Sequence, residues 1–275
     1  MNNLVFEVPL ITSKNNSTIS EIAKLSNKKY RMLSKLFVCD GVKLFEEAVD
    51  FGAKIKYIVI DNLAVLSDEI IEKIRKSASC GAKILCVEKH VFEKLTSENA
   101  PQGVITVCEF YGNKHTFSSN GKKEDFYAKS VVVLESVRDP GNIGTIFRNA
   151  VALGIDKVII SSDCADIYSP KVVRSSMGAI FKLEIQVVDD LVQTVENIKS
   201  NGRRVLAAAI NDKALILGKD ALTSDDVVVL GNEGHGISEK LMNACTNTIF
   251  IPMKGNTESL NVAMASAIIM WELSK

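Results

Sequence analysis

The sequence predicts an α/β protein with a mostly parallel sheet flanked by helices, preceded by a smaller α/β domain. Short apolar runs alternate with stretches of helical periodicity along most of the chain, which is typical of strands joined by helical crossovers. Residues 112–128 interrupt this pattern with a polar stretch rich in Gly, Ser, Asn and Lys, a composition typical of linkers. We therefore expect one domain over residues 1–111 and a second over residues 129–275.

The composition excludes several classes of protein. With 47% hydrophobic residues among 275, the chain can bury a substantial core, and its formal net charge of zero gives no global sign of a nucleic-acid partner. The six cysteines lack CxxC spacing and lie mostly in apolar segments, so we expect reduced core thiols and neither disulfides nor a metal site. No apolar segment approaches a membrane span without a break, so we expect a soluble, cytoplasmic protein.

In the first domain, strands are expected at residues 36–40, 56–61, 83–88 and 103–110, with helices between them at 42–51, 68–79 and from 90. A helix starting near Thr18 should precede them. It carries a basic cluster against the single acid Glu21, made of Lys24, Lys28, Lys29, Arg31 and Lys35. A charge run of this kind is usually a solvated helix face, but it is also suited to contact RNA phosphates.

In the second domain, strands are expected at residues 130–137, 157–163, 183–188, 204–210, 227–230 and 248–253. Helices are expected at 145–153, 169–181, 191–200, 237–245 and 259–273. Strands separated by helices indicate a mostly parallel sheet covered on both faces. Ligands bind such sheets where loops leave the carboxyl ends of the strands.

Three of those loops are rich in Gly, Asn and acidic residues: DPGNIG (139–144), GNEGHG (231–236) and PMKGNTESLN (252–261). None has the GxGxxG register, and the chain has no GxxxxGK[ST], GxSxG or HExxH motif, which disfavours a nucleotide-dependent oxidoreductase. Ser259 and Asn261 alone are equally consistent with the cap of a core helix. His235 is expected to be an exposed loop residue rather than a base, and His115 is expected to be exposed in the linker.

The three loops also carry a resemblance. The segments DPGNIGTIFRNAVALG, VLGNEGHGIS and IPMKGNTESLNVAMASAIIMWE, in this order, resemble the three motifs of the SpoU (TrmH-like) RNA ribose 2'-O-methyltransferases, and YSPKVVRSSMGAIF is similar to a further stretch of that family. The first 110 residues resemble, more weakly, the L30e-like RNA substrate-binding domain of many members, chiefly in ITSKNNSTISEIAKL and FVCDGVKLFEEA. Asp40 stands where members often have Glu, and Ala263 where they often have Ser.

The resemblance implies a C-terminal trefoil knot, an S-adenosylmethionine cofactor, no metal, and a homodimer with the site near its interface. The catalytic positions it implies are Asn142, Arg148, Glu233, Ser259 and Asn261. The positions that hold the cofactor, largely through backbone groups, are Gly231, Ile251 and Leu260. Because arginine stays protonated in proteins, we expect Arg148 to orient the hydroxyl and a phosphate rather than act as the base. Glu233 would orient its polar neighbours, and Ser259 and Asn261 would hold the loop and the nucleophile.

The function implied is methylation of a ribose 2'-hydroxyl in structured RNA, with a guanosine of 23S ribosomal RNA favoured by the added N-terminal domain and by family habit. A transfer RNA methyltransferase is the nearest alternative. A catalytically silent RNA-binding protein of the same fold is the alternative from another class. Binding of S-adenosylmethionine distinguishes the last of these, because a pure binding module would show none.

Overall fold

The structure, a computed structural model, describes residues 1–275 except 113–114, 119–129, 212–213, 221 and 255–258. The chain forms two compact units. The first comprises Met1–Tyr111 and Asp166–Phe181, and the second comprises Gly112–Ala165 and Lys182–Lys275. The segment Asp166–Phe181 therefore groups with the first unit, although the sequence led us to expect it in the second domain.

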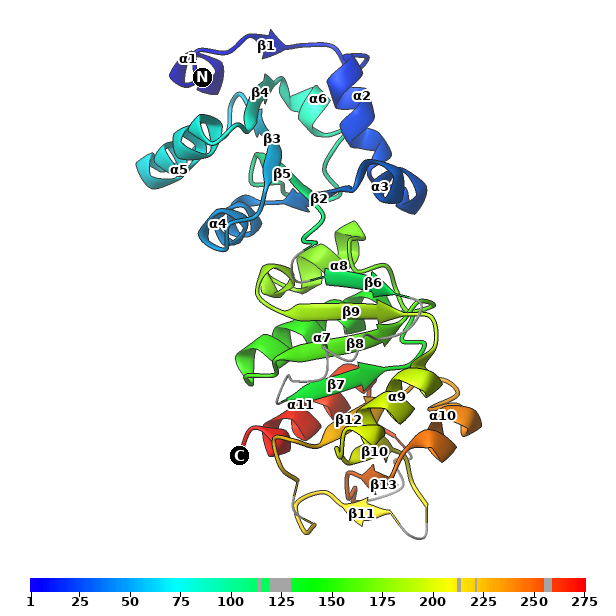
Figure 1. The fold of residues 1–275 in the computed structure, drawn as a ribbon. Helices are drawn as coiled ribbons and strands as arrows, with labels where there is room; N and C mark the ends of the chain where they lie inside the picture. The colour runs from blue at the N-terminus through cyan, green and yellow to red at the C-terminus, as the bar shows by residue number, and fades with distance from the viewer. Residues whose placement is uncertain (113–114, 119–129, 212–213, 221, 255–258) are drawn as a thin grey trace. The chain divides into compact units, whose positions relative to one another are not determined.

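The first unit is built on a five-stranded mixed sheet in the order β1-β4-β3-β5-β2 (Figure 1). The strand β5 runs antiparallel to both β2 and β3, and the other pairs are parallel. The strands are β1 (Leu10–Ile11), β2 (Leu36–Asp40), β3 (Ile55–Asp61), β4 (Lys83–Val87) and β5 (Val104–Glu109). The helices are α1 (Asn2–Val5), α2 (Ser17–Lys24), α3 (Lys28–Ser34), α4 (Val42–Asp50), α5 (Asp68–Ser79), α6 (Lys89–Phe92) and α8 (Pro170–Ser175).

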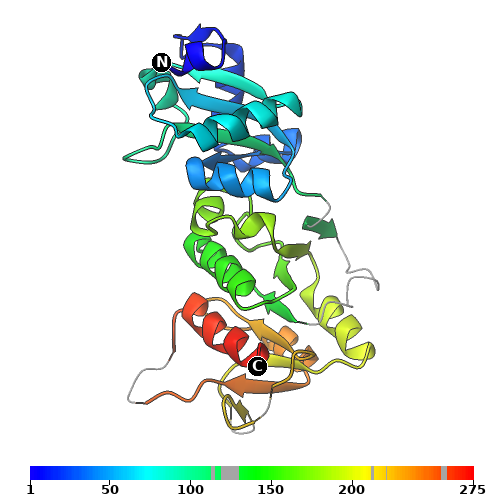
Figure 2. The same cartoon turned by 90° about the vertical axis from the view of Figure 1, so that its left-hand side faces the viewer.

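Helices cover both faces of this sheet. Side chains of α2 and α6 pack with Val59 of β3 in one core cluster, whereas side chains of α4 and α5 pack with Ile58 and Ile60 in another. Successive residues of a strand point to opposite faces, so a single apolar run in β3 supplies both cores. The helix α5 and the pair α2–α3 accordingly lie on opposite sides of the sheet (Figures 1 and 2).

The basic segment near the N-terminus forms two helices, and the expectation of a single helix from Thr18 is wrong. The side chain of Asn16 caps α2, and the side chain of Asn27 accepts a hydrogen bond from the backbone N–H of Lys29 and caps α3. Asparagine is among the best helix N-caps, so Asn27 starts a new helix. Lys35 then ends α3 in a left-handed conformation, with φ of 55°.

The second unit is built on an eight-stranded parallel sheet in the order β11-β13-β10-β12-β7-β8-β9-β6. This confirms the predicted α/β class with a mostly parallel sheet. The strands are β6 (His115–Ser118), β7 (Val131–Leu134), β8 (Lys157–Ser161), β9 (Glu184–Val188), β10 (Val205–Ala208), β11 (Leu215–Ile216), β12 (Val227–Leu230) and β13 (Asn247–Phe250). The knot stays a prediction.

Two pairs of helices flank this sheet. The helices α9 (Leu191–Ser200) and α10 (Glu239–Ala244) pack on alternate residues of β7, β10 and β12 in one core cluster. The helices α7 (Pro140–Ala152) and α11 (Val262–Leu273) lie side by side on the other face (Figures 1 and 2). Within the described residues, no helix has the length and apolar character needed to cross a membrane.

Two expectations about single segments, one now in each unit, are wrong. Residues 115–118, assigned to the linker, form β6 and pair with β9, and His115 is 3% exposed rather than solvated. The helix expected at 169–181 ends at Ser175, because Met177 and Gly178 both have positive φ. A Cβ at Gly178 would lie 2.5 Å from the side chain of Glu47, so glycine is required at this turn.

Candidate active site

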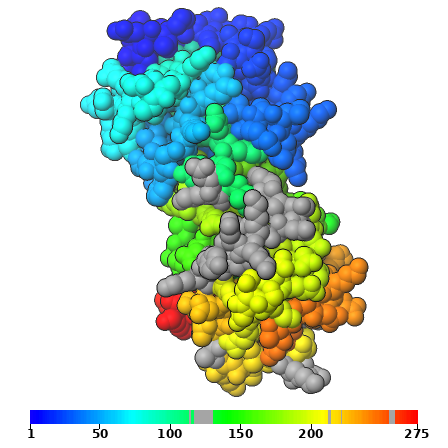
Figure 3. All heavy atoms as spheres, in the orientation of Figure 1, coloured from blue at the N-terminus to red at the C-terminus, as the bar shows by residue number. Residues whose placement is uncertain are grey.

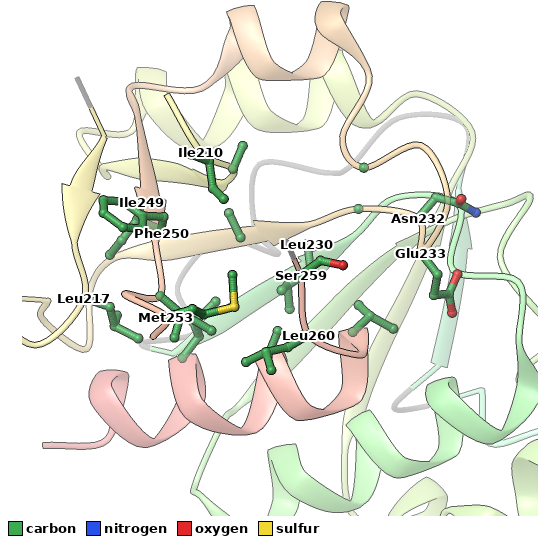
Figure 4. Close-up of a pocket in the computed structure, with 18 of the residues that line it drawn as sticks. Ile210, Leu217, Leu230, Asn232, Glu233, Ile249, Phe250, Met253, Ser259 and Leu260 are labelled. Carbon is green, nitrogen blue, oxygen red and sulfur yellow. The ribbon is translucent and has the colours of Figure 1, made fainter. Parts of the chain in front are cut away.

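A pocket of about 400 Å³ lies at the carboxyl ends of β10, β12 and β13 (Figure 4). Parallel strands bring their carboxyl ends to one edge of the sheet, so the loops that follow them converge there. The wall after β12 is the GNEG segment, the wall after β13 runs from Phe250 to Met253, and the first turns of α11 close the remaining side. The second and third Gly- and Asn-rich loops therefore meet at one cavity.

The three predicted cofactor positions, Gly231, Ile251 and Leu260, all line this pocket. Most other wall residues are apolar, namely Ala208, Ala209, Ile210, Leu217, Leu230, Ile249, Phe250, Met253, Val262, Ala265 and Ile269. Apolar walls with backbone groups at their edges suit a flat heteroaromatic ring held by main-chain hydrogen bonds. The pocket volume lies within the range of roughly 300–1,000 Å³ that is usual for small-ligand sites.

The loop after β12 is held in shape by its own backbone. Asn232 and Gly236 exchange two backbone hydrogen bonds, of 3.0 and 2.9 Å, and the Asn232 side chain donates to the carbonyl of Ser136 at 2.8 Å. A Cβ at Gly231 would lie 2.3 Å from the carbonyl carbon of Gly236. Only glycine therefore allows the two ends of the loop to approach this closely beside the pocket.

A chain of hydrogen bonds joins one residue from each of the three loops. The Asn142 amide donates to Oε1 of Glu233 at 2.7 Å, and the Asn261 amide donates to Oδ1 of Asn142 at 3.1 Å. An ionised carboxylate can only accept, so Glu233 sets the orientation of the Asn142 amide, which in turn sets that of Asn261. The structure thus brings together three of the five predicted catalytic residues.

Asn261 has a second role. Its Oδ1 accepts from the backbone N–H groups of Ala263 at 2.9 Å and Met264 at 3.4 Å, which makes it the N-cap of α11. The cap and the link to Asn142 use different atoms of the same amide, so the cap is confirmed and leaves the amide nitrogen available for the proposed role in the site. Ser259 lines the pocket with Leu260 (Figure 4).

Side-chain hydrogen bonds hold helix α7 at its first turn and again near its end. Asp139 caps its first turn by accepting from the backbone N–H of Asn142 at 2.9 Å. Seven residues further on, Asn149 donates to the carbonyl of Ala263 at 3.2 Å and ties α7 to α11. The expected loop DPGNIG is therefore mostly the first turns of this helix, because Pro140 is well suited to the first helical position.

Arg148 is not at the pocket of its own chain. It is exposed and does not line the cavity, and it has no hydrogen bond or ion pair with the described residues. Six residues separate it from Asn142, which places the two side chains about 120° apart around a helix of 3.6 residues per turn. His235 is exposed as expected, and it is the neighbouring Gly234 and Gly236 that line the pocket.

Comparisons with known proteins agree with this geometry. Residues 129–271 match the model of the SpoU rRNA Methylase family, and residues 16–106 match the MRM3-like substrate binding domain. The chain belongs to the SpoU rRNA methylase family. The first match confirms the predictions of the family and of a methyltransferase, and a related crystal structure with AdoMet bound confirms S-adenosylmethionine as the cofactor.

Relatives of this SpoU protein span nearly its whole length. It is 29% identical to the 23S rRNA (guanosine(2553)-2'-O)-methyltransferase RlmP of Bacillus subtilis, over 96% of this chain and 98% of the relative. It is 30% identical to the 23S rRNA (uridine(2479)-2'-O)-methyltransferase of Streptomyces viridochromogenes, over 95% and 90%. The crystal structure of an AdoMet-bound rRNA methyltransferase from Sinorhizobium meliloti matches with a TM-score of 0.83 and 28% identity, covering 96% of each chain.

The predicted RNA-binding residues of the SpoU chain fall into two groups. Lys24, Lys28, Lys29 and Lys35 are exposed on α2, α3 and the turn after α3. Arg31 is 3% exposed, and its guanidinium donates to Asp166 at 2.6 Å and to the carbonyls of Leu25 and Ser26 at 2.7 and 2.8 Å. Its assignment to the RNA surface is wrong, because its donors are already used inside the first unit.

A polar cluster beside the first motif was missed from the sequence. The Asp163 carboxylate accepts from the hydroxyls of Ser136 and Ser161, both at 2.6 Å, and from Arg138 at 3.3 Å. Burial alone would raise the pKa of Asp163, but these hydrogen bonds outweigh it and the pKa lies below its usual value. Ser136 and Arg138 follow β7, Ser161 is the last residue of β8 and Asp163 follows it, so only their place at strand ends could have signalled them.

Proposed function

We propose that this SpoU protein transfers a methyl group from S-adenosylmethionine to a ribose 2'-hydroxyl of structured ribosomal RNA. The observation that carries the proposal is the hydrogen-bonded chain of Glu233, Asn142 and Asn261 beside an apolar pocket. It joins all three loops that resemble the family motifs. In the sequence, Glu233 and Asn261 lie 91 and 119 positions from Asn142, so only the fold brings the three residues together.

The pocket would hold the cofactor through the backbone of Gly231, Ile251 and Leu260, with its adenine between apolar walls. When bound, the cofactor supplies a methyl group that is already activated as a sulfonium. The protein's task is then to align the ribose hydroxyl and to handle its proton, for which no metal is needed. The Glu233–Asn142–Asn261 chain supports this task by fixing which polar atoms face the reacting ribose.

Arg148 would enter the site through a homodimer. The exposed side of α11 carries Met264, Ile268 and Trp271, which are 63%, 39% and 56% exposed. The spacings of four and three residues place them on one helix face, and an exposed apolar stripe of this kind favours a protein interface. Arg148 lies on α7, which packs beside α11. We propose that α7 and α11 form the dimer interface. Arg148 of one subunit would then orient the ribose hydroxyl and a phosphate at the active site of the other.

The favoured target is a guanosine of 23S ribosomal RNA, supported by the near full-length match to the Bacillus subtilis guanosine methyltransferase. The Streptomyces relative is named for a uridine, so membership of the family does not by itself select the base. We retain the proposed organisation of residues 1–111 as RNA substrate-binding domain, 112–128 as connection and 129–275 as knotted methyltransferase domain, in a cytoplasmic protein. Within the stretch 112–128, residues 115–118 form β6 and belong to the sheet of the second unit. Transfer RNA is the alternative substrate.

The test is methyl mapping. Purified protein, S-adenosylmethionine and either ribosomal or transfer RNA are incubated, and modified nucleosides are located by mass spectrometry of nuclease fragments. We expect one ribose 2'-O-methyl group in 23S ribosomal RNA. Methylation of a base, or of neither RNA, would contradict the proposal. Ribose methylation of transfer RNA alone would replace the substrate but keep the chemistry, and cofactor binding without transfer to any RNA would favour a catalytically silent protein.

A further inference from the structure

A second cavity, of about 320 Å³, lies wholly within the first unit, between the α2–α3 pair and one face of the sheet. Ile22, Leu25, Leu36 and Val107 form its apolar walls. Two aromatic rings, Tyr30 and Tyr57, also line it, together with Glu21, Lys24, Leu33, Ser34 and Lys56. The cavity is therefore apolar inside and has aromatic rings and cations among its lining groups.

The rings and the cations are paired. The Lys24 ammonium lies 5.7 Å from the centroid of the Tyr30 ring, and the Lys56 ammonium lies 5.6 Å from that of Tyr57. Tyr30 is 42% exposed and Leu33 is 73% exposed, so apolar surface at this cavity is left open to solvent by the fold. Large apolar side chains that stay exposed around a cavity are typical of a surface that binds a partner or ligand.

Two exposed lysines line this cavity, and three more lie close in sequence to its lining residues. Besides Lys24 and Lys56, the neighbouring positions Lys28, Lys29 and Lys35 are exposed. In the part of the chain that the structure describes, no salt bridge involves any of these five residues. Figure 3 shows the α2–α3 segment, in blue, at the surface of the first unit. Lysines that no carboxylate neutralises attract an anionic ligand, and phosphates above all.

Arg31 keeps the cavity in shape. Its guanidinium joins the carbonyls of Leu25 and Ser26, in the turn between α2 and α3, to the carboxylate of Asp166. The helix that presents Tyr30 and Leu33 is therefore fixed from its buried side. A binding surface held in this way loses less conformational entropy when its ligand arrives.

We propose that this cavity receives an unpaired nucleobase of the RNA substrate, stacked on Tyr30 with Tyr57 as a further wall, and with adjacent phosphates on Lys24 and Lys56. Aromatic rings stack bases of every type, and lysines beside them track the backbone, which is how single-stranded RNA is generally bound. A volume of about 320 Å³ admits one base with its sugar but no base-paired helix. The inference rests on the proposed function for its choice of RNA as the ligand.

The experiment measures affinity without cofactor, using a short single-stranded RNA oligonucleotide and a blunt RNA duplex of the same length. Tyr30→Leu should weaken binding of the single strand by about tenfold or more, because it removes a stacking face, and should leave duplex binding unchanged. Tyr30→Phe keeps the ring and should bind as the wild type does. Lys24→Gln should lower the slope of log affinity against log salt by about 0.7, the value for one phosphate contact on a single strand.

Lys76→Gln is the matched control for charge, because Lys76 is exposed on α5, on the other face of the sheet. Thermal unfolding of each variant checks that the first unit is folded. A 4-thiouridine in the single strand should crosslink to the peptide that contains Tyr30 or Tyr57. Equal single-strand affinity of Tyr30→Leu and wild type, no binding by the wild type, or crosslinks to other peptides only, would overturn the proposal.

The RNA-binding measurements and the methyl-transfer assay can fail independently of each other. If ribose methylation is found but Tyr30→Leu binds RNA normally, the nucleobase site fails and the proposed function stands. If Tyr30 supports single-strand binding but no ribose is methylated, the proposed function fails and the nucleobase site stands. Binding of anionic phospholipid vesicles that depends on Tyr30, with RNA binding unaffected, would assign the cavity to a membrane surface and overturn it.

Discussion

The pocket of the second unit is closed by loops from distant parts of the chain, whereas the cavity of the first unit is closed by two consecutive helices. The pocket depends on close backbone approach at Gly231 and on polar side chains that bond one another. The cavity depends on one buried arginine, and its lysines Lys24 and Lys56 lie over tyrosine rings but form no salt bridge with the residues that the structure describes. In a site that must align reacting atoms, the polar side chains form hydrogen bonds with one another. In a surface that must attract a polyanion, the charged side chains form no salt bridges within the protein.

The first test of this comparison is a substitution at Gly231, which should disturb the pocket of the second unit. Gly231→Ala places a Cβ 2.3 Å from the backbone of Gly236, so the loop must move and the pocket wall with it. We expect cofactor affinity to fall by about 100-fold, which corresponds to roughly 2.7 kcal/mol, measured by calorimetry. Gly112→Ala is the control, since its Cβ would meet nothing within 4 Å and Gly112 does not line the pocket. Unchanged affinity in Gly231→Ala would remove this loop from the cofactor site.

The second test separates chemistry from cofactor binding. Arg148→Ala should lower methyl transfer by about 100-fold or more, since it removes a charged donor aimed at the reacting ribose. Cofactor affinity should survive, because Arg148 does not line the pocket. Single-turnover rates and calorimetry measure the two quantities. An equal loss of both would mean that Arg148 is structural or holds the cofactor.

The third test acts on the first unit alone. Arg31→Ala leaves the Asp166 carboxylate and two carbonyls without their donor, and removing one partner of a buried pair costs about 3–5 kcal/mol of unfolding free energy. Lys28→Ala, at an exposed position of α3, should change it by less than about 0.5 kcal/mol. Urea denaturation of both variants provides the measurement. Equal stabilities would contradict the structural role of Arg31.

The smallest expected effect is on acid stability. Burial would raise the pKa of Asp226, but hydrogen bonds from Arg204 and Thr223 outweigh it and hold the pKa below its usual 3.8. A lowered pKa in the folded state stabilises the protein above pH 3.8, and this contribution is lost as the pH falls through the lowered value.

Asp226→Asn should therefore be less stable than wild type at neutral pH and should lose less stability on acidification. Urea denaturation at neutral pH and at about pH 3 measures the difference. Asp225→Asn, at the neighbouring exposed carboxylate, is the matched control and should follow the wild type. A difference between Asp226→Asn and wild type that stays constant across this range would contradict the lowered pKa.

The periodicity of the sequence predicted the strands of both sheets wherever they are apolar runs, as in β7 and β12. It missed β6, because a short edge strand with polar residues has no such run and resembles a linker, and it missed the edge strands β1 and β11, because two residues are too few to show a period. The burial of Arg31 was missed for a different reason. Its partner Asp166 lies 135 residues away, and no local pattern reports a contact over that distance.

In the candidate site, too, some features could be predicted from the sequence and others could not. Family resemblance gave the identities of Asn142, Glu233 and Asn261, but only the fold could show that they form one hydrogen-bonded chain. The resemblance also named Arg148, and only the fold shows that it is turned away from the pocket of its own chain. Long-range contacts and the facing of a helix side chain depend on tertiary packing, which propensity and spacing do not encode.

The central claim is that the three motifs act as one hydrogen-bonded unit, and a double-mutant cycle of single-turnover methyl transfer tests it most directly. Asn142→Ala and Glu233→Gln should each slow transfer by about tenfold or more, and the double variant should be little slower than the slower single variant. Cofactor affinity serves as the internal control and should be similar in all four proteins. If the two losses simply multiply in the double variant, Asn142 and Glu233 act independently and the claim is contradicted.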